Sequence, residues 1–141
     1  MSIHLITKKI IKEWTDYNGH MNMSYYVLIF DNAAEVMLTK FNMGEESAQN
    51  DKKSTFAVET HTTYDQEVKL GEEVEVHLTY FDHDKKRIHY RASMFHKEKK
   101  YLAATTEVLS LYIDLNKRKV AEFEPEKIVI MDDFIKSNSS K

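Results

Sequence analysis

One short run in this chain has residue types and a spacing that suit acyl-transfer chemistry. It occupies residues 16 to 22 and reads DYNGHMN, with a carboxylate at Asp16 and a turn-forming glycine at Gly19. It leads directly into an apolar segment, residues 23 to 41, that we expect to be helical. The amino end of a helix exposes unpaired backbone N–H groups and a partial positive charge. A carboxylate beside such an end can serve as a base or nucleophile next to donors that stabilise a developing oxyanion. The run is therefore a candidate catalytic site.

Each polar residue of the run also has a purely structural interpretation. Asp16 precedes Asn-Gly, and an aspartate there commonly forms a turn by bonding local backbone N–H groups. Gly19 suits a turn with positive φ or a close backbone approach to a substrate. His20 is a candidate general base or a local hydrogen-bonding side chain. Asn22 is expected to cap the helix or brace the turn. Donors for an oxyanion are then expected from the backbone N–H groups between Met23 and Tyr25.

A second pair of polar residues, Glu59 and His61, lies two positions apart in a segment with strand periodicity. Their side chains are expected on one face of the strand, opposite Phe56 and Val58. On a solvent-facing surface they are ordinary polar residues, and on the wall of a cleft they contact substrate or position water. The other five histidines are scattered in strands and turns, so we predict no metal site.

The elements that position these residues follow from hydrophobic periodicity. Residues 23 to 41 are apolar around most of the helix circumference, which predicts a helix buried on most sides, with a stop near Gly44. Residues 45 to 54 read as a loop. Residues 3 to 14 favour an extended strand. From Thr55 the period changes to two, and four more strands are expected near residues 55–64, 73–81, 88–94 and 101–113. Short turns between them predict antiparallel neighbours. The predicted fold class is α+β, a curved antiparallel sheet around one long central helix.

Length and composition narrow the function classes. At 141 residues the chain is long enough for one domain, which we place at residues 1 to 130, with a C-terminal tail over 131 to 141. A short helix or an extended arm is expected after Pro125, and residues 134 to 141 read as a frayed end. A net charge of −3 gives no electrostatic case for nucleic acid or an anionic membrane surface. The absence of cysteine excludes disulfides and thiolate chemistry. The first apolar run is broken by Lys8 and Lys9, so no signal peptide is predicted and a cytoplasmic location is expected.

The pattern Asp-x-x-Gly-His-Met-Asn, opening a helix that carries Tyr25 and Tyr26, resembles the hotdog-fold acyl-CoA thioesterases of the 4-hydroxybenzoyl-CoA thioesterase type. The resemblance covers roughly residues 3 to 130. Within that family residues 16–21 and 59–61 are most similar to the betainyl-CoA thioesterases. The resemblance implies that Asp16 is the catalytic carboxylate, which attacks the thioester carbonyl or activates a water to do so. The residues alone do not separate these two roles.

The resemblance also implies the partners of the chain. It implies homodimers or dimers of dimers with active sites at the dimer interface, and it implies no cofactor, since coenzyme A is part of the substrate. An edge strand left uncovered by the single helix favours self-association independently. For a betainyl group, Trp14 and Tyr17 beside Asp16 are candidate aromatic contacts, and Glu59 is a candidate opposite charge from across the dimer interface. If both aromatic residues pack in the core instead, the pocket suits short or aromatic acyl groups.

Two other function classes use the same fold. A non-catalytic acyl-CoA-binding module would not need a carboxylate at position 16, so the presence of Asp16 counts against it. A dehydratase or hydratase of this fold would place its histidine and aspartate in a longer stretch around the helix, and that pattern is missing. We therefore expect an acyl-CoA thioester hydrolase.

Overall fold

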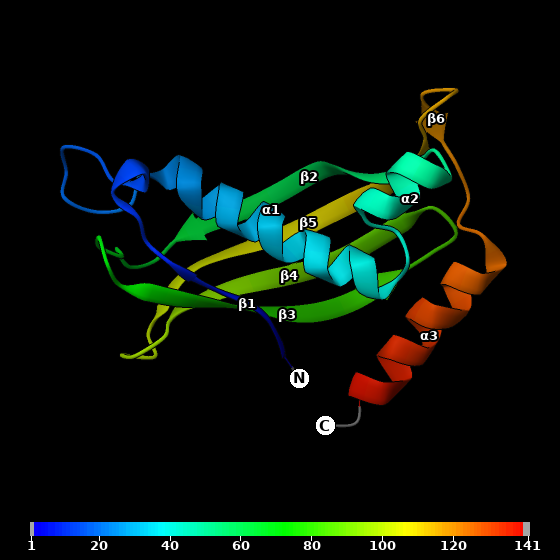
Figure 1. Cartoon of the computed structure of the whole chain (residues 1–141). Coiled ribbons are helices and arrows are strands. Elements are labelled where there is room, and N and C mark those ends of the chain that lie inside the picture. Colours follow the sequence, from blue (N-terminus) through cyan, green and yellow to red (C-terminus); the bar gives the residue numbers. More distant parts are fainter. Residues whose placement is uncertain (1, 140–141) are drawn as a thin grey trace.

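The computed structural model describes residues 2–139 and shows one curved sheet wrapped around one long helix (Figure 1). The strands follow the order β1-β3-β4-β5-β2, all neighbours are antiparallel, and β6 pairs with β5. Helix α1 crosses the concave face of the sheet. This is the α+β hotdog arrangement that the sequence predicts. The strands are β1 (Ile3–Lys9), β2 (Lys53–Tyr64), β3 (Glu73–His83), β4 (Arg87–His96), β5 (Leu102–Asp114) and β6 (Lys119–Val120), and the helices are η1 (Lys12–Trp14), α1 (Met23–Lys40), α2 (Glu45–Asn50) and α3 (Pro125–Ser139).

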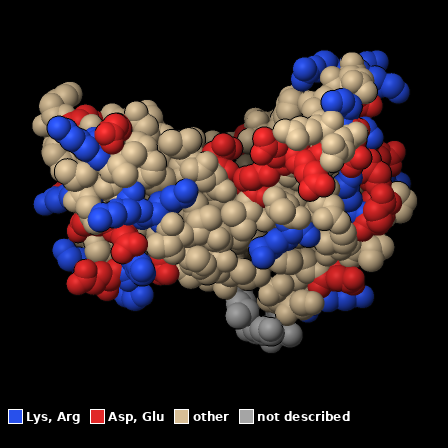
Figure 2. Space-filling model, in the orientation of Figure 1, with Lys and Arg blue, Asp and Glu red and all other residues tan. Residues whose placement is uncertain are grey.

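Helix α1 buries one side against the sheet and leaves the other side open. Its buried residues are spaced by three and four, which is the expected helical stripe. Met23, Val27 and Leu28 are exposed in the single chain, so the prediction of a helix buried on most sides is wrong for the amino-terminal half. The face seen in Figure 2 has an uncharged central area, with acidic side chains gathered above it and mixed charges at both ends. The residues of α1 that reach the core are Tyr26, Ile29, Phe30, Ala33 and Met37.

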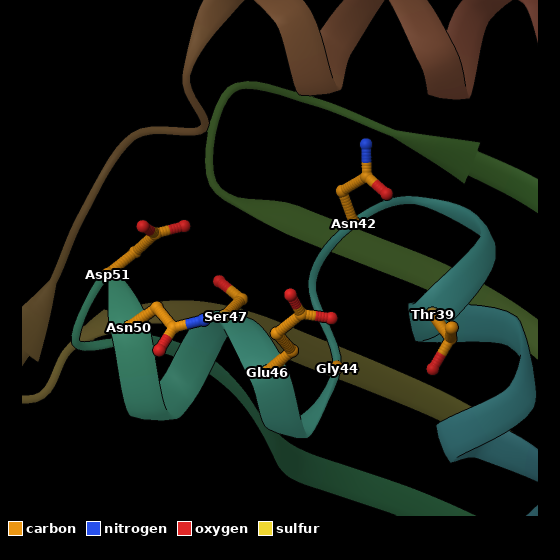
Figure 3. Close-up of a pocket in the computed structure, with 7 residues that line it drawn as sticks. All are labelled: Thr39, Asn42, Gly44, Glu46, Ser47, Asn50 and Asp51. Atoms are coloured by element: carbon orange, nitrogen blue, oxygen red, sulfur yellow. The ribbon is translucent and has the colours of Figure 1, made fainter.

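The carboxyl end of α1 differs from the expectation of a glycine stop. The helix ends at Lys40, and Asn42 takes the left-handed conformation with φ of 59°. The Met43 N–H then donates to the Leu38 carbonyl at 2.9 Å, which closes the last turn. Gly44 is instead the N-cap residue of α2, a short helix in the stretch expected to be a loop. Figure 3 shows the polar hollow between the end of α1 and α2.

Strand β2 contains a bulge between Ala57 and Glu59, and this bulge changes which residues share a face. A continuous period of two would put Phe56 on the same face as Tyr64. The extra residue instead puts Phe56 on the outer, convex face with Glu59 and His61, because paired residues of antiparallel strands project from the same side. The expectation that Glu59 and His61 lie on the face opposite Phe56 is therefore wrong. The partners of Phe56, Glu59 and His61 in β5 are the outward-facing Leu111, Leu109 and Glu107, whereas Thr60 stands opposite buried Val108.

Helix α3 crosses the boundary drawn at residue 130 and continues to Ser139. Met131 is fully buried, and the Phe134 ring packs against Phe41 at 5.2 Å and Tyr80 at 5.8 Å between ring centroids. The expectation of a frayed end from Phe134 onward is thus corrected within the described residues. Local composition did not reveal this packing, because its partners lie far away in the sequence. Residues 140 and 141 lie outside the described residues.

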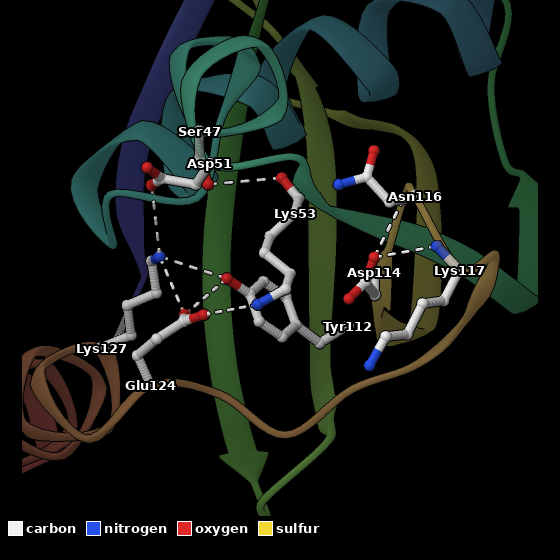
Figure 4. A network of polar contacts seen from close by, with 9 residues as sticks. All are labelled: Ser47, Asp51, Lys53, Tyr112, Asp114, Asn116, Lys117, Glu124 and Lys127. Carbon is white, nitrogen blue, oxygen red and sulfur yellow. Dashed lines mark hydrogen bonds and ion pairs between the residues drawn. The ribbon is translucent and has the colours of Figure 1, made fainter.

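A charged network at the start of α3 joins four elements (Figure 4). The buried Lys127 ammonium donates to the Tyr112 hydroxyl at 3.1 Å and to Glu124 at 2.9 Å, and it lies 3.9 Å from Asp51. Lys53, at the start of β2, donates to the other oxygen of Glu124 at 3.1 Å. Burial alone would raise the pKa of Glu124, but the hydrogen bonds from Tyr112, Lys127 and Lys53 outweigh it and lower the pKa to about 2. The network anchors α2, β2, β5 and α3 to one another.

Candidate active site at the amino end of α1

The loop before α1 is held in place on both sides by backbone hydrogen bonds. Thr15 and Met21 form an isolated antiparallel bridge that closes the loop. The Met21 N–H donates to the Val68 carbonyl, and the Asn22 N–H donates to the Trp14 carbonyl, both at 2.8 Å. Gly19 has a φ of 82°, and an added Cβ would meet nothing within 4 Å. A glycine is therefore favoured there by backbone conformation and not by crowding.

Asp16 is fixed as an ionised carboxylate beside the start of α1. One oxygen accepts a hydrogen bond from the Asn22 side-chain amide at 2.9 Å, and the other accepts from the Asn18 N–H at 2.8 Å. These two bonds, the first being the larger effect, lower the pKa of Asp16, and the charge of nearby His20 contributes less. The Asn18 contact is the local turn bond that the structural interpretation expects. The Asn22 contact links the carboxylate to the helix.

Asn22 connects the carboxylate to the helix cap with a single side chain. Its side-chain oxygen accepts from the Ser24 N–H at 3.0 Å, as predicted for an N-cap. Its backbone oxygen accepts from the Tyr25 N–H at 3.0 Å. The backbone N–H groups of Ser24 and Tyr25, two of the three expected oxyanion donors, are thus already hydrogen-bonded. Within residues 2–139 the Met23 N–H has no hydrogen-bond partner, and the Met23 residue is 65% exposed. Met23 therefore supplies the free donor of this terminus.

His20 and several residues that sequence reasoning missed line a hollow next to this terminus. The hollow has a volume of about 240 Å³. The His20 Nδ1–H donates to the Met21 carbonyl at 2.9 Å, which turns Nε2 toward Glu67 at 3.9 Å. The missed residues come from the end of β2 and the segment after it, about 40 positions beyond the motif, so no local pattern indicates them. The hollow is lined by His20, Met21, Met23, Tyr26, Tyr64, Asp65, Gln66 and Glu67.

The predicted aromatic contacts near Asp16 do not form a cage. Trp14 stacks on Tyr25 with 6.1 Å between ring centroids, so both rings face each other. Tyr17 is 98% exposed and projects from the tip of the loop. In the single chain Tyr17 therefore neither packs in the core nor forms part of an aromatic cage. Trp14 does pack against the core, as the alternative interpretation expects.

Glu59 and His61 lie on the convex face of the sheet, whereas α1 covers the concave face. They line a shallow depression of about 420 Å³ together with His89 and Glu107. His89 contacts Glu107 at 2.9 Å. The structure does not bring Glu59 or His61 together with Asp16 within one chain. The predicted role of Glu59 as an opposite charge from across the dimer interface stays a prediction.

Other parts of the described chain offer less chemistry. The hollow in Figure 3, about 280 Å³ in volume, lies at the carboxyl end of α1 and is lined by polar side chains, with Glu46 and Asp51 carrying negative charge. Among residues 2–139, no group of three or more histidine, aspartate or glutamate side chains has a geometry that could hold a metal ion. None of the described helices is both long and apolar enough to cross a membrane.

Comparison with known proteins gives a consistent result. Residues 11–133 match the Thioesterase-like superfamily. A betainyl-CoA thioesterase of Pseudomonas aeruginosa is 30% identical over 117 residues, which cover 83% of this chain and 74% of that protein. A hypothetical protein of Staphylococcus aureus, solved in complex with CoA, superposes with a TM-score of 0.88 at 26% identity and covers 96% of this chain and 86% of its own. A 1,4-dihydroxy-2-naphthoyl-CoA thioesterase from Synechocystis shares the fold, with a TM-score of 0.81 at 16% identity and coverage of 94% and 97%.

Proposed function

The chain belongs to the Thioesterase-like superfamily, and we propose that Asp16 and the amino end of α1 form its hydrolytic centre. Its activity is the hydrolysis of an acyl-CoA thioester to a free acid and coenzyme A. The observation that carries the assignment to Asp16 is that its carboxylate, whose pKa is lowered, is held by the side chain of Asn22, the residue that caps α1 and directly precedes Met23. Acyl chemistry needs a charged group that attacks or activates water and a donor for the oxyanion, and this terminus holds both.

The proposed reaction begins with the thioester oxygen at the Met23 N–H. The Asp16 carboxylate then attacks the carbonyl carbon, or it removes a proton from a water that attacks. In the first route the carbon–sulfur bond breaks, coenzyme A leaves as a thiolate, and water hydrolyses the resulting mixed anhydride. In the second route the tetrahedral intermediate expels the same thiolate. Because a thiolate is a good leaving group, neither route needs a strong acid beside the sulfur.

A cationic acyl group is the finer proposal for the substrate. The support for it is the Pseudomonas relative, whose name specifies betainyl-CoA. A general short-chain or aromatic acyl-CoA is the alternative. The expectation that no cofactor is needed stays a prediction, and so does the cytoplasmic location.

We also propose that two copies associate along β2, as a homodimer or as part of a dimer of dimers. The strand is 12 residues long and lies at the edge of the sheet, paired on one side only by β5. It exposes Phe56, Val58 and Tyr64. A long edge strand with apolar side chains is a ready site for strand pairing between chains. Such pairing would put the hollow beside Met23 close to the second copy, since Tyr64 ends this strand.

An assay of thiol release over a panel of acyl-CoAs tests the proposed function. Hydrolysis of at least one small acyl-CoA, with stoichiometric release of coenzyme A and acid, is expected. Saturable binding of acyl-CoA without thiol release would instead establish the non-catalytic binding module. Addition of water to an enoyl-CoA with the thioester left intact would establish a hydratase.

A further inference from the structure

The hollow beside Met23 has walls suited to a positive charge. Tyr26 and Tyr64 contact each other edge to face, with 5.3 Å between ring centroids at 88°, and both line the hollow. Asp65 and Glu67 supply two carboxylates to the same lining, which contains no lysine or arginine. Lys69 lies 3.8 Å from one oxygen of Glu67, outside the lining. Aromatic faces combined with carboxylates attract cations, above all methylated ammonium groups, which are weakly hydrated.

The distance from the reacting centre also fits a short cationic acyl group. Tyr26 follows Met23 by three residues, which is about 4.5 Å along the axis of α1. In a betainyl thioester the nitrogen is two bonds from the carbonyl carbon. With the thioester oxygen at the Met23 N–H, a trimethylammonium group at this distance would meet the exposed Tyr64 ring, and the Tyr26 ring, which is 4% exposed, supports Tyr64 by edge-to-face contact.

We propose that Tyr64 and Glu67, with Tyr26 behind them, determine specificity by holding a quaternary ammonium group on the acyl chain. The inference rests on the proposed function, because it places the acyl group in the hollow beside Met23. The residues proposed to contact the cation are thus ones that the fold brings to the site, and not Trp14 and Tyr17. Glu67 supplies a carboxylate to the hollow from the same chain, whereas the charge predicted from Glu59 comes from across the dimer interface.

Asp31 is the competing carboxylate. It lies on α1 at the rim of a smaller hollow of about 120 Å³ that Phe30 and Tyr90 also line. It has no ion-pair partner among residues 2–139, and burial together with its charge raises the pKa of Tyr90 to about 12. Asp31 follows Met23 by eight residues, about 12 Å along the helix axis. A trimethylammonium nitrogen that is two bonds from the carbonyl carbon does not reach Asp31 within one chain. Tyr64 and Glu67 are therefore favoured.

The test compares kcat/KM for betainyl-CoA and for 3,3-dimethylbutyryl-CoA, its uncharged isostere. We expect the wild-type protein to prefer the charged substrate about 10-fold. Tyr64→Leu and Glu67→Gln should each reduce this preference at least threefold, mainly by slowing the charged substrate. Tyr64→Phe keeps the ring and should retain the preference. Glu98→Gln, in an exposed turn between β4 and β5, is the matched control and should leave both rates unchanged.

Each other result would overturn the inference in a distinguishable way. Equal wild-type rates on the two substrates would remove the cation preference but leave the thioesterase assignment intact. A preference that survives both Tyr64→Leu and Glu67→Gln would place the cation elsewhere, and loss of preference in Asp31→Asn would place it at Asp31. Failure of the wild-type protein to hydrolyse any acyl-CoA would contradict the proposed function itself.

Discussion

At the scale of single residues, Asn22 links the chemistry of the site to its local structure. Its side chain donates to Asp16 and caps α1 through Ser24. The sequence indicated the cap because asparagine directly precedes the apolar run, and it indicated Asp16 through the spacing to Gly19. It did not indicate Tyr64 or Glu67, because their proximity to Met23 depends on how β2 ends against α1.

Replacing Asn22 separates these two roles. Serine also caps helices well, so Asn22→Ser should keep the free energy of unfolding within about 0.5 kcal/mol of wild type, whereas Asn22→Ala should lose about 1 kcal/mol. Both variants remove the amide donor that lowers the pKa of Asp16. The pKa of Asp16 should rise toward its ordinary value, and the acidic limb of the kcat/KM profile should move to higher pH in both. An unchanged acidic limb in Asn22→Ser would show that this hydrogen bond does not tune the reacting carboxylate.

At the scale of elements, the order of the strands and the central helix follow from periodicity, while three departures have long-range or backbone causes. The bulge in β2 adds a residue without any glycine or proline to mark it. Helix α2 is six residues long and polar, so it lacks the apolar stripe that identifies longer helices. Helix α3 gains its order from contacts with Phe41, Tyr80 and the network around Glu124.

The network at the start of α3 predicts how stability depends on pH. The pKa of Glu124 is lowered to about 2 in the folded chain, so its contribution is complete above the unfolded value of 4.5. That contribution declines as pH falls from 4.5 toward 2. In this range Glu124 is protonated in the unfolded chain but still ionised in the folded chain, so proton binding favours the unfolded chain. Urea unfolding of Glu124→Gln should give lower stability at pH 7 and a flatter pH dependence in this window. An unaltered slope between pH 2 and 4.5 would contradict a role for Glu124 in acid sensitivity.

The packing of α3 predicts that residues beyond 130 stabilise the fold. Met131 is fully buried, so Met131→Ala should lower the free energy of unfolding by about 2–5 kcal/mol. Lys136→Ala changes an exposed residue of the same helix and should change it by less than about 0.5 kcal/mol. Equal midpoints of thermal unfolding for the two variants would show that α3 does not share the core.

At the scale of the whole molecule, the open side of α1 and the uncovered edge of β2 predict self-association. Sedimentation equilibrium should find at least twice the chain mass of 16.6 kDa. Val58→Lys, on the exposed edge strand, should shift the protein toward the monomer, because a charge on an edge opposes strand pairing. Val129→Lys, on the exposed side of α3, is the matched control and should leave the association state unchanged. A fully active wild-type monomer would refute assembly along β2 as a condition of activity.

The most direct test of the account is the rate of coenzyme A release by Asp16→Asn. The substitution is nearly isosteric and can keep a hydrogen bond to the Asn18 N–H, but it removes the charge that attacks the thioester or activates water. We expect kcat to fall by at least ~10² on the best acyl-CoA of the panel, with circular dichroism and sedimentation unchanged. A folded Asp16→Asn protein that releases coenzyme A at the wild-type rate would contradict the assignment of Asp16 as the catalytic carboxylate.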